Sequence, residues 1–178
     1  YGDSKSNFSG GYSISSVKLI NENSNANYVI TDTRMQIRLP KAMKPGGDVV
    51  KIKIDFSFTL PEYGADRCGI LKTKNGNIFA VAQWYPRMCV FDDVEGWNTL
   101  PYLGPSEFYL EYGDFDLNIT APASHIVVCS GELVNENEVL TPGQVSRMEQ
   151  KKKSDKTVMI RTEAEVTDPS SRPKGNTL

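Results

Sequence analysis

The chain has 178 residues with 22 acidic and 20 Lys or Arg side chains, which gives a formal net charge of -2 at pH 7. This balance argues against a nucleic-acid binder or a membrane-surface binder, because such proteins usually carry a basic footprint. Hydrophobic residues make up 39% of the chain, and no run approaches the ~18 apolar residues of a membrane span. The composition is that of one globular domain, and it leaves the compartment open between a periplasmic or extracytoplasmic location and the cytoplasm.

The first half of the chain alternates between apolar and polar residues, which is the pattern of antiparallel strands with one buried face. Residues 1–11 are polar and predict a flexible leading segment. Strands are predicted over residues 13–20 and 33–39. The strongest alternation covers residues 50–60, where six apolar side chains share one face: Val50, Ile52, Ile54, Phe56, Phe58 and Leu60. These six side chains are therefore expected in the core.

A hairpin is predicted next, with strands over residues 69–73 and 78–85. Asn75 and Gly76 mark its turn, because both residue types tolerate the positive φ angles of a type I′ turn. The returning strand leads directly into the part of the chain that holds both tryptophans.

The end of this returning strand is expected to present polar groups. Pro86 has no backbone donor and restricts the residue before it to extended conformations, so the strand is expected to end at Tyr85. Alternation along the strand then places Gln83 and Tyr85 on one face and Trp84 on the other. A surface of this kind is suited to meeting a partner.

The second half of the chain predicts three more strands and one helix. The strands cover residues 108–120, 125–133 and 158–166, and the helix covers residues 142–152. Three residues give the helix start the signals of a capping box with proline at the first helical position: Thr141, Pro142 and Gln144.

Together these elements predict an all-β protein with antiparallel sheets in a sandwich or saddle-like structure and one short helix near residues 142–152. The predicted domain organisation has a flexible segment over residues 1–11, a β domain over residues 12–167, and a linker over residues 168–178 that is rich in Pro, Ser and Gly.

Few residues offer catalytic chemistry. His125 is the one histidine and lies in an apolar run, which favours a structural role. The chain has no His-Glu-x-x-His or Cys-x-x-Cys spacing, so no metal site is predicted in it. A chain of this size needs no disulfide, which favours three reduced thiols: Cys68, Cys89 and Cys129.

Acidic residues gather in two places. Asp92, Asp93 and Glu95 follow a short apolar run, and carboxylates placed in this way commonly accept hydrogen bonds from the amides of a loop. Asp114 and Asp116 alternate with apolar residues and fit the solvated face of a strand. A carboxylate hydrolase that uses Asp92 or Asp93 with Glu95 stays an alternative, and it requires a cleft and one acid with a raised pKa.

Four stretches of the chain, taken together, match a sequence pattern known from other proteins. They are residues 82–93 (Ala-Gln-Trp-Tyr-Pro-Arg-Met-Cys-Val-Phe-Asp-Asp), 113–122 (Gly-Asp-Phe-Asp-Leu-Asn-Ile-Thr-Ala-Pro), 131–133 (Gly-Glu-Leu) and 157–161 (Thr-Val-Met-Ile-Arg). Together they resemble the amino-terminal domain of the zinc aminopeptidases related to aminopeptidase N. The resemblance runs over roughly residues 30–178, and Gln-Trp-Tyr-Pro brings it closest to bacterial members of that family.

The resemblance implies a saddle-like, non-catalytic β domain that covers a helical catalytic domain. In the family the catalytic domain carries a His-Glu-x-x-His zinc motif and a Gly-x-Met-x-Asn substrate motif, and neither occurs in this chain. The zinc ion and the catalytic domain are therefore expected in another part of the same polypeptide. The expected partners are that domain and the amino terminus of a peptide substrate.

Only part of the family's substrate apparatus matches this chain. Relatives place a Gln or Glu at this strand end, where it lines the pocket for the first side chain of the substrate and helps to hold its free amine. The matching positions are Gln83 and Tyr85. Tyr85 stands where relatives commonly carry a carboxylate, so the resemblance implies binding of the substrate amine chiefly through Gln83.

A different class of function also fits the residues. The chain is alternatively a stand-alone binding β-sandwich for carbohydrate or protein, with Trp84, Tyr85 and Trp97 as an aromatic platform. Coplanar exposed rings would favour the platform, whereas buried tryptophans would favour a domain wall. With no partner domain in place, an open sheet edge and an apolar docking face also predict self-association.

Overall fold

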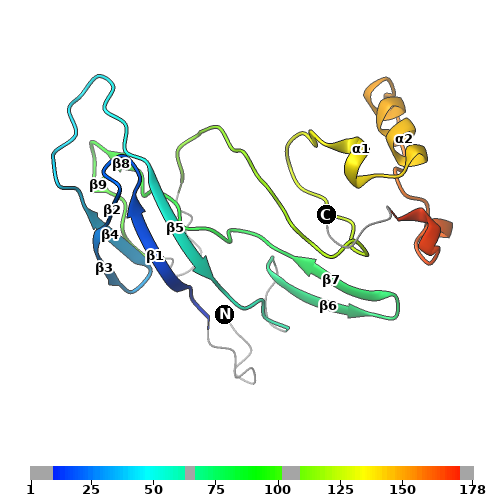
Figure 1. Ribbon diagram of the computed structural model, residues 1–178, viewed down its shortest axis with the longest axis horizontal. Helices are drawn as coiled ribbons and strands as arrows, with labels where there is room; N and C mark the ends of the chain where they lie inside the picture. Colours follow the sequence, from blue (N-terminus) through cyan, green and yellow to red (C-terminus); the bar gives the residue numbers. More distant parts are fainter. Residues whose placement is uncertain (1–9, 63–66, 102–108, 173–178) are drawn as a thin grey trace. The chain divides into compact units, whose positions relative to one another are not determined.

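A computed structural model describes residues 10–62, 67–101 and 109–172 of the chain (Figure 1). The chain divides into two compact units, Tyr1–Gly113 and Asp114–Leu178. Within the described residues the regular structure is mostly antiparallel strand, with two α-helices and two 3-10 turns. The prediction of an all-β class is therefore confirmed, and each unit is described by itself below.

The first unit is built on a three-stranded antiparallel sheet in the order β2-β1-β5 (Figure 1). Its strands are β1 (Ser13–Leu19), β2 (Ser24–Asn25) and β5 (Ile52–Ser57). The register pairs Val17 with Ile54 and Leu19 with Ile52, so the apolar side chains of both strands share one face. Val17 and Leu19 are 3% and 4% exposed and form the most buried part of this face.

Strand β5 is shorter and less buried than the alternation over residues 50–60 predicts. It covers six residues, and Ile54 and Phe56 are half-buried while Ile52 is 36% exposed. The reason is its position, because β5 is the last strand of its sheet within the described residues and is flanked on one side only.

Three two-stranded hairpins complete the strands of this unit. They are β3 (Asn27–Thr31) with β4 (Arg34–Arg38), β6 (Gly69–Thr73) with β7 (Gly76–Ala80), and β8 (Phe91–Asp92) with β9 (Gly96–Trp97). The turn between β6 and β7 consists of Lys74 and Asn75, one residue earlier than predicted. Gly76, with φ of 115°, takes the positive backbone angle and opens β7.

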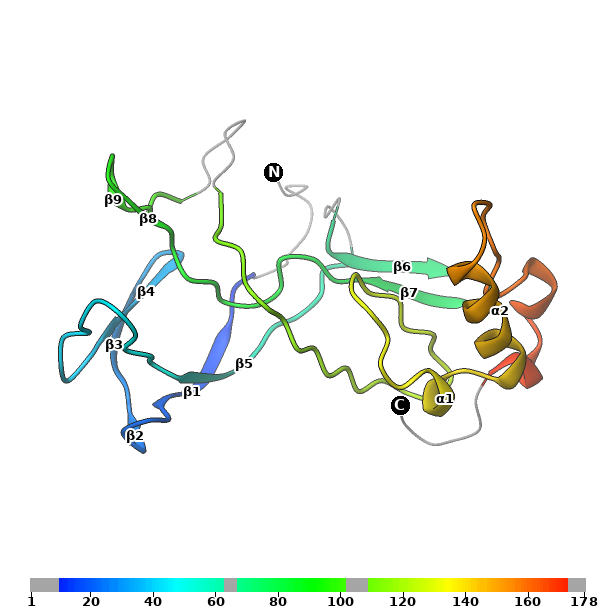
Figure 2. The ribbon, with the colours of Figure 1, turned by 90° about the horizontal axis from the view of Figure 1, so that it is seen from above.

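The second unit holds the helices: α1 (Glu136–Val139), α2 (Pro142–Lys152) and the 3-10 turns η1 (Glu163–Glu165) and η2 (Pro169–Ser171). Helix α2 begins and ends as predicted, and Thr141 and Gln144 form the predicted capping box. Figure 2 shows α2 beside the two 3-10 turns, to which polar side chains connect it.

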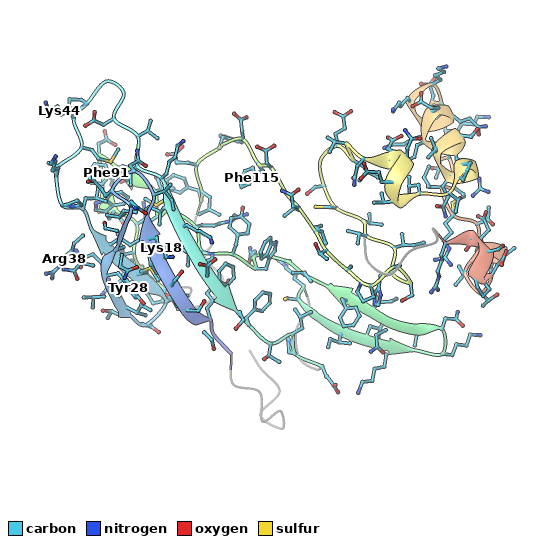
Figure 3. The ribbon with its side chains drawn as sticks, in the orientation of Figure 1. Lys18, Tyr28, Arg38, Lys44, Phe91 and Phe115 are labelled. Carbon is cyan, nitrogen blue, oxygen red and sulfur yellow. The ribbon has the colours of Figure 1, made fainter. Side chains whose placement is uncertain are left out.

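Three predicted strands are not present. The described parts of residues 108–120, 125–133 and 158–166 are irregular or turn-like, and residue 108 lies outside the described residues. Phe115, labelled in Figure 3, is 70% exposed, and Val128 is 90% exposed. A strand needs a neighbour for its backbone hydrogen bonds, and within the described residues these stretches pair with no other strand. The pattern of apolar and polar residues alone therefore does not predict strands correctly in these three stretches.

The predicted flexible segment over residues 1–11 and the predicted linker over residues 168–178 lie partly outside the described residues, which begin at residue 10 and stop at residue 172. The described start of the predicted linker is more ordered than its composition suggests. Asp168 caps η2 by accepting from the Ser170 amide, and Ser171 is buried. The linker over residues 168–178 therefore begins with a packed turn.

Candidate functional site

Five aromatic side chains of the first unit contact one another around β5, and we call them the aromatic cluster: Tyr12, Phe56, Phe58, Trp84 and Tyr85. The Tyr12 ring lies 5.1 Å from that of Phe56 and 5.7 Å from that of Phe58, measured between centroids. Trp84 stacks on Phe56 at 6.3 Å and meets Tyr85 edge-on at 5.2 Å. The cluster joins the segment after β7 to strand β5, since edge-to-face and offset rings attract one another.

The backbone at Gln83 departs from the predicted strand. Strand β7 ends at Ala80, and Gln83 has a φ of 51°, which no strand residue adopts. The prediction that Gln83 and Tyr85 lie on one face of a strand that ends at Tyr85 is therefore wrong. A left-handed residue turns the chain, so Trp84 reaches the Phe56 ring from an irregular segment.

Tyr12 holds this turn in place. Its hydroxyl donates to the Gln83 carbonyl oxygen at 3.3 Å, while its ring packs on β5. Burial raises the pKa of the Tyr12 hydroxyl, and the negative charge of the Cys68 thiolate raises that pKa further. Tyr12 therefore remains a protonated donor at neutral pH.

The two predicted substrate-binding residues differ in exposure. The Gln83 side chain is exposed, whereas Tyr85 is half-buried in the aromatic cluster. The Arg87 guanidinium carbon lies 4.9 Å from the centre of the Tyr85 ring, which is cation–π distance. The exposed Gln83 amide therefore lies two residues before the Tyr85 ring, which contacts both Trp84 and Arg87.

A shallow hollow of about 470 Å³ lies beside the cluster. Its lining combines rings with short polar side chains: Ser15, Ile54, Asp55, Phe56, Ser57, Phe58 and Trp84. The hollow is open to solvent, so it offers a surface for a flat or extended group rather than an enclosed cavity.

The rings do not form the flat platform that a stand-alone binding sandwich would need. The planes of Trp84 and Tyr85 meet at 68°, and Trp84 is half-buried. Trp97 belongs to β9, where it is 54% exposed and packs edge-on against Phe91 at 5.1 Å. The ring geometry disfavours the aromatic-platform alternative.

Asp92 holds the β8–β9 loop, as predicted for its loop-binding role. Its carboxylate accepts from the Val94 and Glu95 amides at 3.0 Å and 2.8 Å, from Asn98 Nδ2 at 2.7 Å, and from the Tyr109 hydroxyl. These bonds, led by that from the Glu95 amide, lower the pKa of Asp92 to about 2. A carboxylate hydrolase needs a raised pKa on one acid, and Asp92 is shifted in the opposite direction.

The remaining candidates do not assemble into a catalytic group. His125 lies in an irregular stretch, where its ring nitrogen is 3.3 Å from the Ser124 hydroxyl. Asp114 and Asp116 are exposed, as predicted, although on no strand. All three cysteines are free thiols. In the described ranges no three His, Cys, Asp or Glu side chains are grouped to hold a metal ion.

Tyr12, Phe56 and Phe58 are the site residues that the sequence did not single out. Phe56 and Phe58 were predicted only as core residues of the alternating run, and Tyr12 lies just before the first strand. The available signal was an aromatic residue just before one predicted strand and two phenylalanines in another. The contact between Tyr12 and Gln83 could not be predicted, because the two residues are 71 positions apart in the sequence.

Comparisons of the chain with protein-family models, with curated proteins and with solved structures give no match. No helix among residues 10–62, 67–101 and 109–172 has the length and apolar character to cross a bilayer.

Proposed function

We propose that this chain is the non-catalytic amino-terminal domain of a zinc metallo-aminopeptidase. In this role it packs on the catalytic domain of the same polypeptide and lines the pocket for the amino end of a peptide. The observation that carries the proposal is the Gln83–Tyr85 segment. Its sequence resembles the family's substrate-facing stretch, and its Gln83 side chain is exposed on a backbone held by Tyr12 and Trp84.

The chemistry of the segment supports binding rather than bond cleavage. The Gln83 amide oxygen can accept a hydrogen bond from a substrate ammonium group, and the Tyr85 ring can stack on the first side chain of the peptide. Because the Gln83 backbone is held by the Tyr12 hydrogen bond, little ordering is required when the peptide binds.

The described residues do not fit a zinc ion, since no three ligands of the usual types lie together there. The zinc ligands belong, on this proposal, to the catalytic domain, and no step of the reaction passes through the residues of this chain. We therefore expect this chain, mixed with zinc and an aminoacyl chromogenic substrate, to give no turnover. Zinc-dependent hydrolysis by the chain itself would contradict the assignment.

The binding role is tested in the full-length protein by replacing Gln83 with Ala. Loss of one hydrogen bond to a charged group is expected to raise KM about tenfold, with kcat little changed. Gln36→Ala is the matched control, because Gln36 is also exposed but lies on β4. Equal KM values for wild type and Gln83→Ala would remove Gln83 from the pocket.

A further inference from the structure

Strand β5 exposes one edge of its sheet. Within the described residues the strand order is β2-β1-β5, so β1 flanks one side of β5 and no strand flanks the other. An edge of this kind presents a row of backbone N–H and C=O groups that can pair with another strand. This inference concerns that edge alone and does not depend on the proposed function.

The hydrogen bonds to β1 identify the groups on the outer edge. The Lys51 carbonyl accepts from the Ile20 amide at 2.8 Å, and the Asp55 carbonyl accepts from the Ser15 hydroxyl at 2.9 Å, so these residues face β1. Backbone groups alternate in direction along a strand, and therefore those of Ile52, Ile54 and Phe56 face the outer edge.

A second copy of β5 can pair with this edge in an antiparallel, two-fold arrangement. Three such registers pair at least two of the three outward residues of each copy, and their centres are Lys53, Ile54 or Asp55. Centring on Lys53 or on Asp55 would place two like charges opposite each other, which is unfavourable. Centring on Ile54 instead places each Lys53 opposite the Asp55 of the second copy and pairs Ile52 with Phe56.

The Ile54-centred register satisfies three requirements at once. Each of the three outward residues gains both backbone hydrogen bonds, the two charged residues become complementary, and the apolar face of the sheet continues across the junction. Lys53 and Asp55 already lie within ion-pair distance, at 3.2 Å, in one chain. Ile52, the most exposed apolar residue of β5, would be covered by a Phe56 ring.

We propose that the outer edge of β5 binds a second copy of this chain and forms a continuous six-stranded sheet centred on Ile54. The dimer is isologous, since the same residues contribute from both copies. The order of strands across it is β2-β1-β5 followed by β5-β1-β2 of the second copy.

The proposal is tested by sedimentation equilibrium with charge-reversed variants of the chain. Lys53→Asp gives an edge with two acidic residues and Asp55→Lys an edge with two basic residues, so each variant alone is expected to weaken the dimer about tenfold or more. Mixed in equal amounts, the two edges are complementary again, and a heterodimer visible by native mass spectrometry should recover the affinity of the wild type.

Two further variants control for folding and for charge in general. Lys51→Asp reverses a charge at the residue directly before β5, where the register places only Ser57 opposite, so its dimer constant should change less than twofold. The double variant Lys53→Asp with Asp55→Lys should dimerise as the wild type does, which shows that each altered position is tolerated. Circular dichroism checks the strand content of every variant.

Three results would overturn the proposal. One is a wild-type chain that stays monomeric at all concentrations, which would mean that another segment or partner covers the edge. The second is a dimer that persists unchanged in both single variants, which would place the interface elsewhere. The third is a mixture of the two variants that remains monomeric.

Discussion

At the scale of single residues, Gln83 combines a strained backbone with an exposed amide. A left-handed conformation costs a residue with a Cβ atom roughly 1–2 kcal/mol, and here the Tyr12 hydroxyl and the Trp84 ring stabilise it. Such strain often accompanies functional sites, because the chain is held in one conformation for a ligand.

We predict that Gln83→Gly stabilises the chain by about 0.5–1 kcal/mol. Glycine relieves the backbone strain at positive φ, and this gain exceeds the cost of the larger conformational entropy that glycine loses on folding. The free energy of unfolding in urea measures this change. Gln36→Gly is the control, since it places glycine inside strand β4 and should destabilise the chain. A destabilising Gln83→Gly would mean that the Gln83 side chain makes a structural contact.

Asp92 predicts a defined pH dependence. Its pKa is about 2 in the folded chain against an ordinary value of 3.8, so the charged carboxylate stabilises the β8–β9 loop above pH 4. This contribution is lost as the pH falls from about 4 toward 2, because the proton binds more tightly to the unfolded chain than to the folded one.

We therefore expect Asp92→Asn to unfold at lower urea concentration than the wild type at pH 7, and the difference to shrink steadily below pH 4. Asp93→Asn, at the exposed neighbouring position, is the control for a general change in charge. A difference between Asp92→Asn and wild type that stays constant from pH 7 to pH 2 would show that the Asp92 charge does not stabilise the loop.

At the scale of elements, Gln144 connects the helix start to the end of the described chain. It is 2% exposed, its side-chain oxygen accepts from the Thr141 amide at 2.9 Å, and its nitrogen donates to the Ser171 carbonyl at 2.9 Å. Arg147, one turn later on α2, donates to both carboxylate oxygens of Glu165 at 2.7 Å. Polar contacts therefore hold the two 3-10 turns against α2.

We predict that Gln144→Ala destabilises the second unit by about 2–3 kcal/mol, because it removes a helix cap and leaves a buried carbonyl unpaired. Gln150→Ala on the exposed side of the same helix should change stability by less than about 0.5 kcal/mol. Hydrogen exchange of the α2 amides measures both effects. Equal protection of these amides in the two variants would count against the buried cap.

The elements also show which features a sequence can predict. Helix α2 was predicted to the residue because its signals are local: a capping residue, a proline and a glutamine within four positions. Apolar and polar residues also alternate over residues 114–120, yet this stretch forms no strand, since a strand depends on a distant neighbour that no local pattern specifies. The hairpin turn shifted by one residue for a related reason, because the register of β6 and β7 decides which residues lie in the turn.

The site was predictable only in part. The choice of the segment around Gln83 stays a prediction from the sequence, whereas the predicted loop-holding role of Asp92 agrees with its hydrogen bonds. The left-handed backbone at Gln83 and its hydrogen bond from Tyr12 were not predicted, because both depend on a tertiary contact across 71 residues.

At the scale of the whole molecule, the proposed function rests on a few features of the first unit. The exposed Gln83 amide, the held Tyr85 ring and the open hollow beside Trp84 suit contact with a second domain and a peptide end. Asp92 stabilises the β8–β9 loop through hydrogen bonds to its amides.

The most direct test of this proposal is to sequence the transcript that encodes the chain past the codon for Leu178. We predict that the same reading frame continues into a helical domain with a Gly-x-Met-x-Asn motif and a His-Glu-x-x-His motif. A frame that ends shortly after Leu178, or one that continues without either motif, would contradict the assignment to a zinc aminopeptidase.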